Sequence, residues 1–103
     1  MDPSEQLARI YQAGFDVQQF DRYPRAFGIV REGAIALFEP TPEGLRMIGA
    51  PGWRMGEVMG VLVEREGRQV FQAKSETVEA TAERLEAIRR FREDLEILLT
   101  SKA

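Results

Sequence analysis

The stretch that most constrains the fold is residues 27–38, which read Phe-Gly-Ile-Val-Arg-Glu-Gly-Ala-Ile-Ala-Leu-Phe. Two short apolar runs flank Arg-Glu-Gly, a pattern that predicts a β-hairpin. Glycine tolerates positive φ without steric cost, whereas a two-residue type I′ turn would force Glu32 to positive φ as well. We therefore expect Arg31 and Glu32 to form a type I turn, followed by Gly33 in a left-handed G1 bulge.

This three-residue loop determines which side chains share a face of the hairpin. It pairs Val30 with Ala34, Ile29 with Ile35, and Phe27 with Leu37. One face then carries large apolar side chains: Phe27, Ile29, Ile35 and Leu37. The other carries mostly small ones: Ala26, Gly28, Val30, Ala34, Ala36 and Phe38. Because neither face is polar, both faces must be covered, and the small-residue face is the one that a helix or a second subunit can approach closely.

Length and composition indicate a globular protein. The 103 residues suffice for a single α+β domain, residues 1–103, with one core, and a content of 44% apolar and 30% charged residues is ordinary for such a domain. No run of about 18 apolar residues is present, so no membrane span is expected. Residues 1–5 are acidic, where a signal peptide would be basic and then apolar, which favours a cytoplasmic location.

The chain contains no cysteine and no histidine. This composition excludes disulfides, the usual Cys/His zinc sites and the histidine-dependent nucleophiles of many hydrolases. The sequence therefore predicts no cofactor and no metal site, and it disfavours an enzyme. A net charge of −3 also disfavours general nucleic-acid binding, which is typical of basic domains.

Helices are expected at both ends of the chain. Pro3 suits the first helical position and Gly14 suits the position just past a helix end, so the first helix should span about residues 3–13. Its apolar stripe is expected at Leu7, Ile10 and Tyr11. The last helix should begin between residues 78 and 82, because Thr77 and Thr81 are both candidate N-caps. Its apolar positions recur at helical spacing: Ala82, Leu85, Ile88, Phe91, Leu95 and Leu98.

Between the helices, the pattern predicts an antiparallel sheet of about five strands built from hairpins. Outside the central hairpin, strands are expected at residues 45–48, 58–64 and 68–74. Residues 15–20 are expected to form either an edge strand or an irregular crossing. A second Arg-Glu-Gly sequence, residues 65–67, is expected to close a hairpin in the same bulged register. Residues 49–56 are the least regular stretch and are expected to form a loop. The predicted class is α+β, with the long C-terminal helix packed on the sheet.

The best candidate for a ligand site is this loop, which holds the only tryptophan, Trp53, next to Arg54. An indole beside guanidinium groups can bind an anion, a nucleotide base or a carboxylate-bearing ligand. An earlier loop contributes three further candidates: Arg22, Tyr23 and Arg25. The alternative interpretation, which we favour, is that Trp53 fills one end of the core while Arg54 lies along the surface.

Two classes of function fit these features. The first is a non-catalytic binding or assembly module, homodimeric and acting through protein–protein contacts, because the small-residue face of the hairpin has no assured cover within the chain. The second is a small-ligand or anion-binding domain centred on Trp53 and Arg54. Tryptophan fluorescence during a screen of metabolites and nucleotides separates them, because only the second class predicts a shift on ligand binding.

Overall fold

A computed structural model describes residues 3–21, 23–74 and 76–100 and shows a helix at each end of a seven-stranded antiparallel sheet. In chain order the elements are α1 (Pro3–Gln12), β1 (Asp16–Gln18), β2 (Phe27–Arg31), β3 (Ala34–Thr41), β4 (Gly44–Met55), β5 (Val58–Arg65), β6 (Arg68–Ala73), β7 (Glu76–Glu79) and α2 (Ala82–Thr100). Each strand neighbours the next one along the chain. The predicted α+β class and the long C-terminal helix on the sheet are confirmed, whereas β7 has no counterpart among the expected strands.

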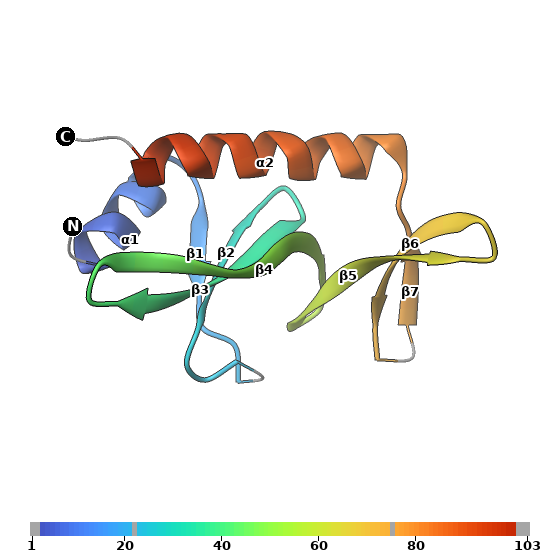
Figure 1. The fold of residues 1–103 in the computed structure, drawn as a ribbon, viewed down its shortest axis with the longest axis horizontal. Helices are drawn as coiled ribbons and strands as arrows, with labels where there is room; N and C mark the ends of the chain where they lie inside the picture. Colours follow the sequence, from blue (N-terminus) through green and yellow to red (C-terminus); the bar gives the residue numbers. More distant parts are fainter. Residues whose placement is uncertain (1–2, 22, 75, 101–103) are drawn as a thin grey trace.

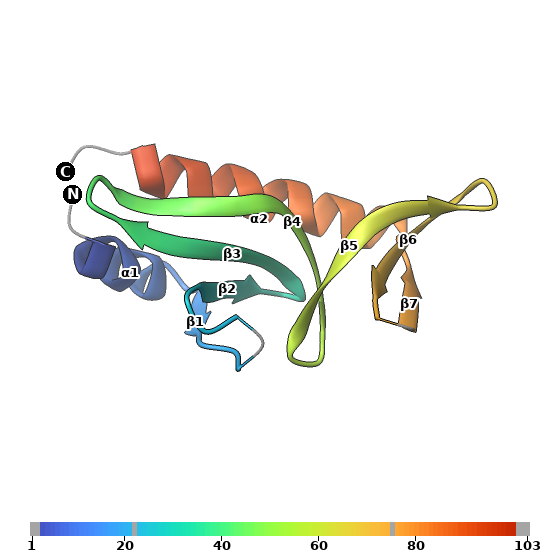
Figure 2. The same ribbon diagram turned by 60° about the horizontal axis from the view of Figure 1, so that its bottom comes forward.

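The molecule is elongated, with extents of 45 × 26 × 19 Å. Figure 1 shows α2 running along the long axis, with α1 near its C-terminal end, β7 below its N-terminal end, and the β5–β6 hairpin extending beyond that end. Strands β1 to β4 form one half of the curled sheet, and β5 to β7 continue from the point where β4 and β5 cross (Figure 2). Since α2 contacts α1, β3 and β4, the helix is anchored on the first half.

The turn of the central hairpin differs from the predicted one. Arg31 lies opposite Ala34, which leaves Glu32 and Gly33 as a two-residue loop. Both have positive φ, 52° for Glu32 and 89° for Gly33, as a type I′ turn requires. The predicted G1 bulge is therefore wrong. The backbone twist of a type I′ turn matches that of the strands, and this match outweighs the steric cost of a left-handed glutamate.

The change of one residue in register also changes which side chains share a face. The face toward the helices carries Ile29, Ala34, Ala36 and Phe38, which form one core with Ile10, Phe15, Phe91 and Leu95. On the opposite face, Val30 and Ile35 pack against Phe20 from the segment before β2. Both faces of the hairpin are thus covered, as predicted, and the cover comes from within the chain. Burial of the hairpin does not require a second subunit.

The second Arg-Glu-Gly sequence forms the same kind of turn between β5 and β6. Arg65 lies opposite Arg68, and the loop residue Glu66 has a φ of 53°. The bulged register predicted for this hairpin is therefore wrong for the same reason. Each of the two turns holds a glutamate in a backbone conformation that asparagine tolerates better.

We expect Glu32→Asn and Glu66→Asn each to raise the free energy of unfolding by about 1 kcal/mol, because Asn-Gly is a preferred type I′ pair. Urea denaturation measures the change. Glu64→Asn in β5 is the matched control, since it removes a carboxylate without relieving positive φ, and it should give no stabilisation. Equal stabilisation by all three variants would show that charge, rather than backbone strain, is responsible.

The sequence signals for the helix ends are confirmed. Gly14 has a φ of 98°, and its N–H donates to the carbonyl of Tyr11 at 3.1 Å. The N–H of Phe15 donates to the carbonyl of Ile10 at 3.3 Å, which completes a Schellman motif at the end of α1. Tyr11 itself is 67% exposed, so its predicted place in the apolar stripe is wrong. At the start of α2, the Thr81 hydroxyl accepts the backbone N–H three residues along, at 3.2 Å.

Strand β4 runs through the stretch that the sequence predicts as a loop. Trp53 and Arg54 both lie in this strand, so the predicted loop around them is wrong. The irregularity that the glycines indicate is instead a bulge. The register between β3 and β4 shifts between Ile35 and Leu37, and Gly49 of β4 has a φ of 67° there. Bulges of this kind bend a strand without ending it.

Candidate functional site

Of the four described residues predicted to form one ligand site, Trp53 lies apart from Arg54 and Tyr23. Neighbouring side chains of a strand point to opposite faces, so Trp53 and Arg54 leave β4 on opposite sides of the sheet. Arg25 is exposed in the turn before β2. Arg22 lies outside the described residues. Sequence reasoning groups these residues because it treats them as parts of flexible loops, in which strand alternation does not apply.

Trp53 lies on the helix side, at the joint between the two halves of the sheet. Its ring stacks on Phe71 of β6, with 5.9 Å between ring centroids and 23° between the planes. The guanidinium of Arg84, in the first turn of α2, lies 5.6 Å from the Trp53 ring. Gly33 approaches the indole so closely that an added Cβ would lie 2.5 Å from a ring carbon. These contacts give Trp53 a packing role that joins the hairpin turn, β6 and α2.

Arg54 lies on the other face, close to Phe20, and Tyr23 packs against the same cluster. The Arg54 guanidinium is 5.4 Å from the centroid of the Phe20 ring, and its Nε donates to the carbonyl of Gly56 at 2.9 Å. The Tyr23 hydroxyl accepts the N–H of Met59 at 3.3 Å. These polar groups have partners within the chain, and ligand binding by them stays a prediction.

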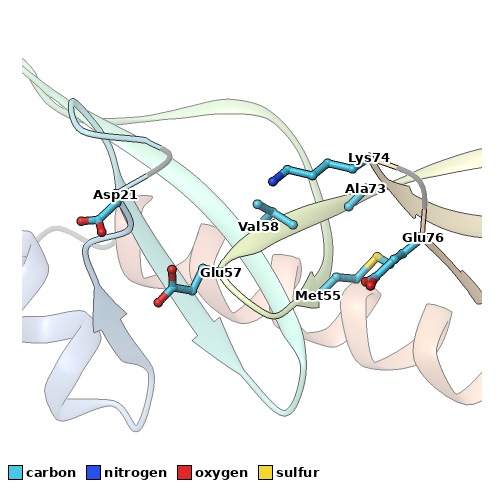
Figure 3. A pocket seen from close by; sticks show the side chains of 7 residues that line it. All are labelled: Asp21, Met55, Glu57, Val58, Ala73, Lys74 and Glu76. Carbon is cyan, nitrogen blue, oxygen red and sulfur yellow. The ribbon is translucent and has the colours of Figure 1, made fainter.

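A polar cleft of about 620 Å³ opens between the segment before β2, the β4–β5 turn and the β6–β7 turn. Its lining residues are Asp21, Met55, Glu57, Val58, Ala73, Lys74 and Glu76. Figure 3 shows the Asp21 and Glu57 carboxylates and the Lys74 ammonium group spaced around the opening rather than converging on one point. Within the described ranges, no group of three or more acidic, histidine or cysteine side chains is arranged to hold a metal ion. The cleft lacks the convergent geometry that acid–base chemistry needs.

A second hollow, of about 540 Å³, lies beside α2 and is mainly apolar; we term it the α2 groove. It is lined by Gly49, Ala50 and Pro51 of β4, by Met59, Val61 and Leu62 of β5, and by Leu85, Ile88, Arg89 and Arg92 of α2. The groove opens where β5 leaves β4, because these strands pair only from Trp53–Gly60 to Met55–Val58 (Figure 2). Its volume lies in the range of known ligand sites.

The groove exposes apolar side chains that the rest of the fold leaves unburied. Leu62 pairs with Phe71, shares its face toward α2, and is 41% exposed. Its neighbour Val61 points to the opposite face, where it is 54% exposed. Leu85 and Ile88 of α2 are only partly buried. Apolar side chains that gather in a hollow, rather than scatter singly, are typical of binding surfaces. The α2 groove is therefore the strongest candidate functional site in the described part of the chain.

Two arginines form the polar rim of the groove. Arg89 pairs with Glu86 and, at 2.6 Å, with Glu93, while Nε of Arg92 donates to Glu96 at 3.1 Å. The pKa of the Glu86 carboxyl is lowered, chiefly because this carboxyl accepts a hydrogen bond from Arg89. These pairs hold the guanidinium groups in place along the helix. No described residue of the lining itself is acidic, so the groove combines an apolar floor with a rim of ion-paired arginines.

Sequence reasoning missed the groove. The available signal is the run of apolar residues 61–63, which places apolar side chains on both faces of a strand and so predicts cover on both sides. The point at which β5 separates from β4 is a tertiary feature that this pattern does not contain. From the sequence pattern alone, residues 61–63 are predicted to be buried in the core.

Comparison with known proteins adds no family: the chain matches no family model, no curated protein and no solved structure. Among the described residues, no helix has both the length and the apolar character needed to cross a membrane. The fold and the site therefore define only a broad class, a small α+β protein with an open apolar groove beside its C-terminal helix.

Proposed function

We propose that the chain is a non-catalytic binding module that acts through protein–protein contacts, with the α2 groove as its binding surface. The observation that supports this proposal is the exposure of Leu62 on the floor of a hollow whose rim carries arginines. An apolar centre with arginine nearby is the usual composition of a protein interface. The polar cleft supports an enzyme less well, since its charged groups do not converge.

The partner in this proposal is a second copy of the chain or a different protein. A homodimer would use the groove or the outer surface of α2, where Ile97 is 65% exposed, because both hairpin faces are already covered. Light scattering at tens of micromolar distinguishes the two. A mass near twice that of the chain, lost in Leu62→Asp, supports a homodimer through the groove, whereas a monomeric mass rules the homodimer out.

Selection from displayed libraries of linear peptides and of small folded helical domains tests the proposal as a whole. We expect ligands that bind the wild type and bind Leu62→Asp at least about tenfold more weakly, because a carboxylate in the apolar floor is costly to desolvate. Ile97→Asp is the matched control, since it makes the same change at an exposed apolar residue of α2 outside the groove lining.

Circular dichroism should show that both variants keep the wild-type fold. If the libraries yield no ligand, or only ligands that bind Leu62→Asp and the wild type equally, the α2 groove is not a binding surface and the proposed function is wrong. Ligands that lose affinity only for Ile97→Asp would move the binding surface to the outer side of α2.

A further inference from the structure

Strand β5 presents an open backbone edge to the α2 groove. On one side, β5 pairs with β4 only as far as Trp53–Gly60. From Val61 onward, β6 is its only partner among the described strands. The side of β5 that β4 leaves free is the side on which the groove lies, with Leu62 in the lining. Such an edge is a template for a further strand.

The alternation of an antiparallel ladder identifies the backbone groups on this edge. Arg65 closes a two-residue hairpin loop, so its backbone bonds toward β6, and every second residue does the same. The residues between them, Leu62 and Glu64, direct their N–H and C=O groups to the open side. Gln69 of β6, opposite Glu64, supports this assignment, because its carbonyl accepts the N–H of Ala80 at 3.1 Å, away from β5.

The neighbouring edge of β4 is protected, in contrast to that of β5. Near the start of β4, the N–H of Leu45 donates to the side-chain oxygen of Gln6 of α1 at 2.7 Å. Near the crossing with β5, Pro51 has no N–H to offer, and the bulge around Gly49 bends the strand. Capping side chains, prolines and bulges are the means by which proteins keep sheet edges from pairing. From Val61 to Glu64, the open stretch of β5 has no proline and no bulge, and Glu64 is its one charged side chain.

We propose that the α2 groove binds an extended segment of a partner protein, which adds to the sheet as a strand along the open edge of β5. This inference rests on the proposed function and specifies its ligand. The backbone of the segment pairs with Leu62 and Glu64, and its apolar side chains lie against Leu85 and Ile88 of α2. Main-chain hydrogen bonds supply affinity in this mode of binding, and pockets for alternate side chains supply specificity.

Charge complementarity favours a segment that carries a carboxylate. The charged residues of the groove lining are Arg89 and Arg92, and the carboxylates that pair with them along α2 lie outside the lining. A guanidinium group binds a carboxylate through two parallel hydrogen bonds, which sets orientation as well as affinity. The segment that fits the groove alternates apolar with small polar residues and has an acidic residue at the end that reaches the arginines.

Short synthetic peptides of alternating valine and threonine, with a glutamate at one end, are the probe for this proposal. We expect them to bind the wild-type chain and to slow amide hydrogen exchange at Leu62 and Glu64 by about tenfold or more. Val61 and Val63 should change little, since their amides already bond to β6. Nuclear magnetic resonance resolves these amides one by one.

Two controls separate strand addition from simple apolar contact. Peptides that are N-methylated at their central residues keep every side chain but lose backbone donors, and they should bind about tenfold more weakly. Glu64→Pro removes a donor on the open edge without removing a bond to β6, so it should weaken binding. Glu64→Ala changes the same side chain, keeps the N–H, and should bind peptide as the wild type does.

Each remaining outcome overturns the proposal. No binding of the peptides at millimolar concentration, or binding without protection of Leu62 and Glu64, excludes strand addition. Helical ligands from the displayed libraries that depend on Leu62 would also exclude strand addition, although they would support the proposed protein-binding function. Protection that appears without peptide and grows with protein concentration assigns the edge to a second copy. If peptides and displayed ligands alike are indifferent to Leu62→Asp, the proposed function fails as well.

Discussion

Replacing Phe91 by alanine should lower the free energy of unfolding by about 3–5 kcal/mol, a large share of the total stability of a domain of this size. Phe91 is fully buried and projects from α2 into the main core. Its ring meets Phe15 edge to face, with 5.7 Å between centroids and 63° between the planes. The residue therefore ties the long helix to the segment that follows α1, and alanine would leave a cavity that a close-packed core cannot refill.

Urea denaturation of Phe91→Ala measures this loss, and Ile97→Ala is the matched control in the same helix. Since Ile97 is 65% exposed, its truncation should change the free energy of unfolding by less than about 0.5 kcal/mol. Trp53 fluorescence and circular dichroism should report the same transition, because Trp53 connects both halves of the sheet. If both variants lowered the free energy of unfolding by a similar amount, the cluster around Phe91 on the first half of the sheet would not be the main core.

The features that the sequence predicts correctly are those with local causes. Gly14 ends α1 because only glycine adopts the required left-handed conformation easily, and Thr81 begins α2 because its hydroxyl satisfies a free N–H of the first turn. Phe91 and Leu95 are recognised as core from their helical spacing alone, and both are fully buried. The two-sided burial of the hairpin also follows from its composition, whichever register it adopts.

The features that the sequence does not predict depend on small energies or on distant contacts. The backbone conformation of one residue, Glu32, decides the register of the central hairpin, and the two alternatives differ by only about 1 kcal/mol in local strain. That choice moves side chains from one face of the sheet to the other. The glycines around Trp53 and Arg54 indicate a loop by sequence, although a bulge accommodates those glycines within β4.

The candidate site is harder to predict than the fold, because it depends on the crossing of β4 and β5. Glycines allow this crossing. They make no side-chain contact there, and the absence of a side chain gives the two strands room to approach. An added Cβ at Gly52 would lie 2.2 Å from the backbone oxygen of Gly60. The two strands can therefore cross at this distance only if residue 52 has no side chain.

Gly52→Ala should lower the free energy of unfolding by about 3 kcal/mol, the upper end of the cost of overpacking, because the obstacle is backbone rather than a movable side chain. Gly28→Ala is the comparison, since its added Cβ would lie 2.2 Å from the Phe20 ring. Phe20→Leu should recover part of the stability lost in Gly28→Ala. Met59→Ala should recover none in Gly52→Ala, although Met59 is also near that Cβ.

The same substitution connects the fold to the binding surface. Any adjustment that accommodates a methyl group at Gly52 has to shift β5 against β4, which displaces Leu62 from the floor of the α2 groove. We therefore expect the Gly52→Ala variant to lose peptide binding even at temperatures where circular dichroism shows it folded, whereas Gly28→Ala, whose obstacle lies on the other side of the sheet, should bind normally when folded. Urea denaturation and peptide titration at low temperature measure the two effects separately. A folded Gly52→Ala variant that binds peptide as tightly as the wild type would show that the crossing does not shape the groove.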